Sequence, residues 1–161
     1  MKEYMQFVSE MKMNPEDIYN NFTRHKADQL HMGLGLIGEF EEFVEAVNNE
    51  DVKEIVSEAG DVYFYFYGFF EHVAEVQFQI VDESTLDNPI RLCGRVGEFL
   101  KKVYIQDKTN RLDELIEYIF KMKAYVSYVI HYELGLKVEN VLKENMNKLN
   151  NRHPNGFDKS K

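Results

Sequence analysis

The sequence has little of what marks secreted, membrane-spanning or disordered proteins. It contains one cysteine, Cys93, and three prolines among 161 residues. A single cysteine excludes an intrachain disulfide and suits a reducing compartment. The richest apolar run, VYFYFYGFF at 62–70, is too short to cross a bilayer. The first residues, MKEYMQFVSE, lack the apolar segment of a signal peptide. We therefore expect a cytoplasmic protein with no membrane partner.

Positive charge is also scarce. The chain carries 28 acidic against 19 basic side chains, which gives a net charge of −9. Because binding to a nucleic-acid backbone needs a basic surface, we expect no nucleic-acid partner, whereas a small ligand or a cation stays open. With 161 residues, of which 44% are hydrophobic, the chain is about one domain long and can bury a core.

Apolar residues recur at three- and four-residue spacing through most of the chain, which is typical of α-helices. We expect an all-α fold, a helical bundle of about five to six helices. The expected helices span 2–13, 16–48, 51–80, 88–106, 110–134 and 138–150. The second of these is expected to be broken or loosened near Gly33 and Gly35, and the last ends before Pro154, since proline cannot continue a helix.

Four glutamates lie in GEFEEFVEAV at 38–47, within a helix that has to bury one side. At about 100° per residue, Glu41 and Glu45 point away from the apolar face, whereas Glu39 and Glu42 lie on its border. That face consists of Leu36, Phe40, Phe43, Val44 and Val47. The ordinary interpretation of such a run is a solvated helix surface.

A second acidic pair, Glu58 and Asp61, follows in VSEAGDVYFYF and borders the apolar face of the next helix. The short connector NNED would let the two helices pack antiparallel and bring four carboxylates together. Such a cluster is repulsive unless it is neutralised, and Mg²⁺ prefers carboxylate oxygens. The residues by themselves leave both interpretations open, a solvated surface or a metal site.

Two segments, HMGLGLIGEFEEF and VKEIVSEAGDVYFYF, closely resemble the MazG-like branch of the all-α nucleoside triphosphate pyrophosphohydrolases. A third, NMNKLNNRHPNGF at 145–157, is similar to the C-terminal segment of that family. The resemblance covers 28–70 and 138–157. Each motif is weak by itself, but three in order at fitting separations are specific.

The resemblance implies a Mg²⁺-dependent enzyme, with Mn²⁺ as a substitute metal. Its metal ligands and catalytic carboxylates would be Glu39, Glu42, Glu58 and Asp61, and its substrate-binding residues His31, Asn145, Lys148 and Arg152. The implied reaction splits a nucleoside triphosphate into the monophosphate and pyrophosphate, in nucleotide-pool housekeeping or supply. For His31, a capping or packing role is an alternative. The aromatic run at 63–67 is expected in the core, although one ring at a pocket edge could stack on a base.

The middle of the chain resembles a second copy of the first hairpin. A gapless shift of 56 residues gives eight identities in 29 columns, from Leu36 paired with Leu92 to Phe64 paired with Phe120. Arg95 then takes the place of Glu39, so this copy has lost a ligand. We expect one domain over 1–161 with a pseudo-twofold tandem of helical hairpins, as in the related dimeric dUTPases. The active hairpin would span about 28–80, the degenerate one about 88–134, and the phosphate-contacting segment about 138–157.

Two other functions compete with the enzyme. A carboxylate-bridged di-iron bundle needs two Glu-x-x-His motifs, and no histidine here follows a glutamate by three residues. A non-catalytic nucleotide- or metal-binding helical interaction module would explain the degenerate second half, but not four intact ligands beside Lys148 and Arg152. We also expect a homodimer, which an apolar face left over on the helix at 110–134 would support.

Overall fold

The computed structural model describes residues 2–71 and 88–154, and its described part is all-α. The helices are α1 (Lys2–Met11), α2 (Pro15–Asn21), α3 (Arg24–Asn48), α4 (Val52–Phe70), α5 (Pro89–Leu100), α6 (Leu112–Tyr128) and α7 (Val138–Arg152). π-Helical turns extend α5 over Lys101–Ile105 and α6 over Val129–Glu133, and a 3₁₀ turn at Thr109–Arg111 precedes α6. Among the described residues, no helix is long and apolar enough to cross a membrane.

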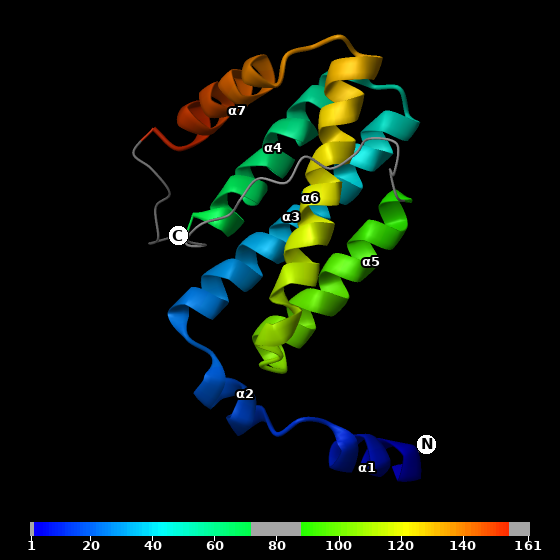
Figure 1. The fold of residues 1–161 in the computed structure, drawn as a ribbon, viewed down its shortest axis with the longest axis vertical. Coiled ribbons are helices and arrows are strands. Elements are labelled where there is room, and N and C mark those ends of the chain that lie inside the picture. The colour runs from blue at the N-terminus through cyan, green and yellow to red at the C-terminus, as the bar shows by residue number, and fades with distance from the viewer. Residues whose placement is uncertain (1, 72–87, 155–161) are drawn as a thin grey trace.

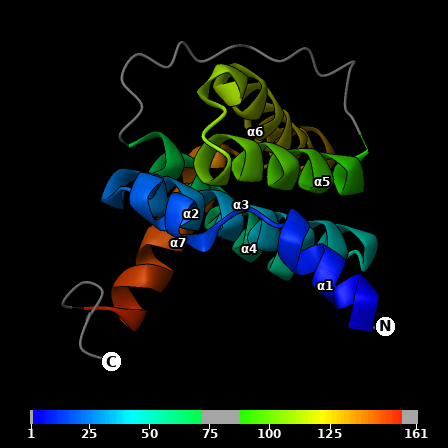
Figure 2. The ribbon, with the colours of Figure 1, turned by 90° about the horizontal axis from the view of Figure 1, so that it is seen from below.

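Two antiparallel hairpins make up the bundle. Figure 2 shows the α5–α6 hairpin stacked on the α3–α4 hairpin, with α7 on the far side of α4. The core fills the space between the hairpins and includes the fully buried rings of Phe40, Phe43, Tyr63, Phe66 and Phe69. The predicted apolar faces of α3 and α4 are therefore the faces that pack, and the predicted all-α bundle is confirmed.

The connection between α3 and α4 is tight. Asp51 caps α4, because its Oδ1 accepts hydrogen bonds from the backbone N–H groups of Lys53 at 3.1 Å and Glu54 at 3.2 Å. The preceding residue, Glu50, has a φ of 57°, which lets the chain reverse. The acidic connector thus starts α4 in the register that sets Glu58 and Asp61 against α3.

The predicted break near Gly33 and Gly35 is wrong, since α3 runs unbroken through both glycines. The break lies earlier, at Phe22 and Thr23, where the Thr23 side chain caps α3 by accepting from Lys26 N. The glycines provide space, because a Cβ at Gly33 would collide with Leu100 and one at Gly35 with the Tyr65 ring. Close packing of neighbouring helices therefore outweighs the roughly 1 kcal/mol that a helical glycine costs.

The other predicted helices agree with the structure to within a few residues, except at the end of α4. The helix predicted for 51–80 ends at Phe70, with Glu71 as its C-cap, and 72–80 lie outside the described residues. The proposed C-terminal segment is described as far as Pro154, so its last three residues are not placed.

Helices α1 and α2 extend away from the bundle in Figure 1 and bury none of their residues. Their large exposed apolar side chains are Tyr4, Met5, Phe7, Val8, Met11 and Tyr19, with Met13 between the helices. On the predicted helix at 110–134, by contrast, the large apolar side chain most exposed is Tyr132. Apolar surface is thus left over at the N-terminus and not at 110–134, where the homodimer prediction had looked for it.

Candidate functional site

A cavity of about 520 Å³ opens where α3, α4 and α7 meet, and charged side chains form most of its wall. We call it the carboxylate cavity. Its lining residues are Glu39, Glu42, Lys53, Glu54, Ser57, Glu58, Asp61, Lys148 and Arg152. Acidic groups come from α3 and α4, and α7 contributes two cations, so the cavity offers binding groups for a cation and for an anion at the same time.

Three carboxylates form the centre of this cavity. Oxygen atoms of Glu39, Glu58 and Asp61 lie within 4.8 Å of one another, and all three side chains are half-buried. Their positions follow from the core, because Glu39 precedes the buried Phe40 and Glu58 precedes the buried Ala59. Each carboxylate therefore stands at the edge of a packed helix face.

Burial and like charge determine the electrostatics of this centre. Burial, followed by the charges of Asp61, Glu42 and Glu58, raises the pKa of Glu39 to about 7. Burial and the charge of Asp61 also raise the pKa of Glu58, against the opposing effect of Lys148. A hard divalent cation would stabilise the charged forms of Glu39 and Glu58, and the three clustered carboxylates offer it oxygen ligands. The donor set thus fits Mg²⁺.

Helix α7 is held against Asp61 by two side chains. Asn145 Nδ2 donates a hydrogen bond to Asp61 Oδ1 at 2.7 Å, and the Lys148 ammonium pairs with Asp61 Oδ2 and reaches Ser57 Oγ at 3.2 Å. Gly60 makes this approach possible, because a Cβ there would lie 2.7 Å from Asn145 Cβ. The close packing of α7 on α4 therefore accounts for a glycine at position 60.

The structure brings most of the residues predicted from the sequence into one place. The carboxylate cavity is lined by Glu39, Glu42, Glu58, Asp61, Lys148 and Arg152, and Asn145 contacts Asp61. Glu42 lies outside the group of three clustered carboxylates. His31 is exposed, its ring 6.2 Å from that of Tyr65, and does not line this cavity. The roles of all eight residues remain predictions.

Three lining residues, Lys53, Ser57 and Glu54, were not in the set predicted from the sequence. Lys53 adds a cation from α4. Ser57 holds Lys148, and Glu54 adds a carboxylate at the rim. Helical spacing could have found both, since Ser57 and Glu54 lie one turn before Asp61 and Glu58 on the same side of α4.

Comparison with known proteins identifies one family. Residues 28–88 match the model of the MazG nucleotide pyrophosphohydrolase domain, a stretch that includes the four predicted carboxylate ligands but not α7. No curated protein and no solved structure matches the chain. The match and the predicted motifs agree on the same two helices. Residues 28–88 are therefore similar to the MazG nucleotide pyrophosphohydrolase domain, as the sequence motifs had indicated.

Proposed function

We propose that the protein hydrolyses a (deoxy)nucleoside triphosphate to the monophosphate and pyrophosphate in the presence of Mg²⁺, in nucleotide-pool housekeeping or supply. The observation that carries this proposal is the carboxylate cavity, in which carboxylates of α3 and α4 stand opposite the cations of α7. A triphosphate with its metal needs both kinds of group in one site. The family match over residues 28–88 supports the same reaction class.

The clustered carboxylates Glu39, Glu58 and Asp61 would hold Mg²⁺, or Mn²⁺ in its place, and Glu42 lies close enough to the cluster to raise the pKa of Glu39. When bound, the ion would neutralise the charge of phosphate oxygens and lower the pKa of a water molecule bound to it. The chain contributes the position of the oxygen donors, since Asn145 fixes the carboxylate of Asp61 by donating to its Oδ1.

The cations of α7 would bind the phosphate oxygens. Lys148 and Arg152 lie one helical turn apart and line the same wall of the cavity. Without substrate, Lys148 neutralises Asp61, so binding of a nucleotide with its metal would transfer this ammonium from the carboxylate to phosphate. Hydrolysis then adds water at the α-phosphorus and breaks its bond to the bridging oxygen, and pyrophosphate leaves.

Pyrophosphate release from a panel of canonical and damaged (deoxy)nucleoside triphosphates tests the proposal. Wild type should release pyrophosphate and the matching monophosphate only with Mg²⁺, and both Glu42→Gln and Asp61→Asn should be nearly inactive. Glu41→Gln is the matched control, because Glu41 is exposed on α3 and lies outside the carboxylate cavity. If no nucleotide is hydrolysed while Mg²⁺ still raises the melting temperature of wild type, the protein is a binding module and not an enzyme.

The proposal includes a homodimer in the cytoplasm. Tyr4, Phe7, Val8 and Met11 are exposed and recur at three- and four-residue spacing on α1, so they share one helix face. An apolar face left uncovered in this way supports a dimer. Light scattering should give twice the chain mass of 19.1 kDa. A mass of one chain at micromolar concentration would refute the dimer and leave the proposed reaction standing.

A further inference from the structure

A second cavity, of about 650 Å³, lies between α4 and α7, with Met32 of α3 at its edge. We call it the apolar cavity. Its other lining residues are Gly60, Phe64, Tyr67, Gly68, Glu71, Leu142, Asn145, Met146, Leu149 and Asn150. The volume is in the range of small-molecule sites, and a mainly apolar wall with a few polar groups is their usual composition. None of the roles assigned so far uses this cavity.

The apolar cavity adjoins the carboxylate cavity. Gly60 lines the first and its neighbour Asp61 lines the second, and the hydrogen bond from Asn145 to Asp61 joins the two walls. A ligand with its charged end at Asp61 therefore has its other end within reach of the apolar cavity. Phe64 and Tyr67, both about half exposed, offer aromatic rings there on which a flat group can stack.

Asn145 is held in one orientation. The residue is only 8% exposed, and its Nδ2 donates to Asp61 Oδ1. Because a carboxylate only accepts hydrogen bonds, the amide has to turn its nitrogen to Asp61 and its oxygen elsewhere. None of the described residues donates a hydrogen bond to Asn145 Oδ1. Asn145 thus brings to the wall of the apolar cavity an amide whose Oδ1 accepts no hydrogen bond from the described residues.

We propose that the apolar cavity binds the nucleobase and that Asn145 Oδ1 selects a base with an amino group on C4 of a pyrimidine or C6 of a purine, which is cytosine or adenine. The inference rests on the proposed function, because it places the triphosphate in the carboxylate cavity. Uracil and hypoxanthine carry a carbonyl oxygen where cytosine and adenine carry the amino group. In their complexes this oxygen and Asn145 Oδ1 would face each other as two hydrogen-bond acceptors. In this proposal Asn145 contacts the base, whereas the resemblance to the family had suggested a contact with the triphosphate.

Two pairs of nucleotides that differ at this one group provide the test. The non-hydrolysable α,β-imido forms of dCTP and dUTP, and of dATP and dITP, are titrated into wild type with Mg²⁺ in a calorimeter. We expect each amino nucleotide to bind at least about tenfold more tightly than its oxo partner. A bound oxo base would bury Asn145 Oδ1 without a hydrogen-bond donor, which is costly. Pyrophosphate release from dCTP and dUTP is measured in parallel.

Two variants attribute this preference to Asn145. Asn145→Ala should bring the ratio of affinities within each pair close to one. Gly60→Ala should do the same, because its Cβ would displace the Asn145 side chain. Asn147→Ala is the matched control, since Asn147 is exposed on the same helix and lines neither cavity, and it should keep the wild-type ratio. Thermal unfolding checks that each variant is folded.

The outcomes separate this inference from the proposed function. Equal binding within both pairs, or preference for the oxo nucleotides, overturns the inference even if pyrophosphate is released. A tenfold preference that Asn145→Ala abolishes supports it even if no nucleotide is hydrolysed, in which case only the proposed reaction fails. Absence of binding by all four nucleotides overturns the inference as well.

Discussion

Hairpins α3–α4 and α5–α6 bury seven pairs of residues that a shift of 56 in the numbering matches, but other pairs differ, since Phe64 is exposed and Phe120 is buried. The tandem repeat stays a prediction. The paired buried residues are Leu36 and Leu92, Phe40 and Val96, Phe43 and Phe99, Ala59 and Leu115, Tyr63 and Ile119, Phe66 and Met122, and Phe70 and Val126. Both hairpins also turn through a non-glycine residue with positive φ, 57° at Glu50 and 56° at Asp107. With the shift of 56, Glu50 falls one residue before Asp107, so the two turns are out of register by one residue.

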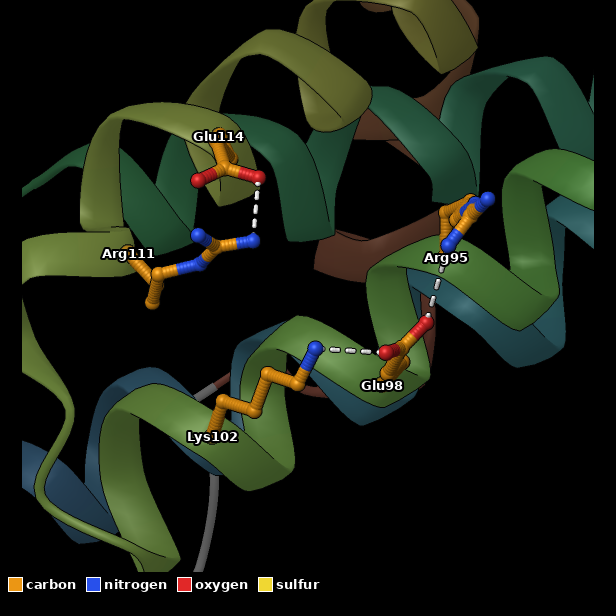
Figure 3. Close-up of polar contacts among 5 residues, drawn as sticks. All are labelled: Arg95, Glu98, Lys102, Arg111 and Glu114. Carbon is orange, nitrogen blue, oxygen red and sulfur yellow. Dashed lines mark hydrogen bonds and ion pairs between the residues drawn. The ribbon is translucent and has the colours of Figure 1, made fainter.

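The carboxylates of the two hairpins have opposite surroundings. In the second hairpin Glu98 contacts Lys102 at 2.5 Å and Arg95 at 3.1 Å, and Glu114 contacts Arg111 at 2.8 Å (Figure 3). Lys102 above all lowers the pKa of Glu98. In the first hairpin, burial and neighbouring anions raise the pKa of Glu39 instead. In the second hairpin the chain's own cations thus neutralise Glu98 and Glu114. Of the three clustered carboxylates in the first hairpin, Asp61 pairs with Lys148, whereas no ion pair of Glu39 or Glu58 is found among the described residues. We therefore expect Glu39 and Glu58 to bind a cation from solution.

Removing one carboxylate from each hairpin should give the largest difference between the hairpins, measured as the loss of kcat/KM. Asp61→Asn should lower kcat/KM roughly 10²–10³-fold, the usual cost of losing a charge that stabilises the transition state. Its counterpart Glu117→Gln should change kcat/KM less than about twofold, because Glu117 is exposed and paired with Lys121. Steady-state pyrophosphate release measures both. Equal losses in the two variants would mean that the second hairpin also carries catalytic groups.

Mg²⁺ should stabilise the protein through the first hairpin only. At a concentration of 100 times its Kd, a ligand adds about 2.7 kcal/mol to the free energy of unfolding. For a chain of this size that raises Tm by roughly 5–10 °C. Glu58→Gln should abolish most of this rise and Glu114→Gln none of it, as differential scanning fluorimetry with Mg²⁺ and with EDTA would show. A rise that survives Glu58→Gln would place the metal elsewhere.

Metal-free stability should respond with opposite signs in the two hairpins. The pKa of Glu39 is raised from 4.5 to about 7, so the unfolded chain ionises first and stability falls as pH rises between these values. Glu39→Gln stays neutral and should be more stable than wild type above pH 7, by about 1 kcal/mol after solvent screening.

The control for this prediction is Glu98→Gln. Because the pKa of Glu98 is lowered by Lys102, its ionised form stabilises the fold at neutral pH, and this contribution is lost as pH falls toward and below 4.5. The variant should therefore be less stable than wild type at pH 7 and equal to it in acid. Urea unfolding in EDTA measures both variants, and a shift of the same sign would refute the contrast.

The smallest effect is expected at the two turns. Glu50→Gly should raise the free energy of unfolding by about 0.5 kcal/mol, because glycine adopts positive φ without the cost borne by other residues. Asp107→Gly should give less, since Asp107 also pairs with Lys26 at 2.6 Å and that contact is lost. Urea unfolding distinguishes them, and equal gains would show that the contact with Lys26 contributes nothing.

Periodicity predicted the helices and their buried faces, because spacing along the chain determines which side chains share a helix side. The clustering of Glu39 with Glu58 and Asp61 followed from the same geometry and a short connector. The position of the carboxylate cluster could therefore be predicted from helical spacing, and the family match over residues 28–88 agrees with it.

Contacts between distant segments could not be predicted. The glycines of α3 were interpreted as a break, because nothing near them indicates that Leu100 and Tyr65 occupy the space they leave. The true break at Thr23 did have a local signal, a capping threonine, which the helical spacing on both sides obscured. Likewise, the orientation of Asn145 depends on Asp61, 84 residues away.

The unbroken α3 packs against α4 on one side and α5 on the other along its 25 residues. In hydrogen exchange, amides in such a central helix are released only by global unfolding, whereas α1 and α2, which bury nothing, should exchange almost freely. Glu39 lies on α3, which we expect to be the last helix to open. Fraying of the N-terminal helices would therefore leave the carboxylates in place, and one half of the site persists for as long as the protein is folded.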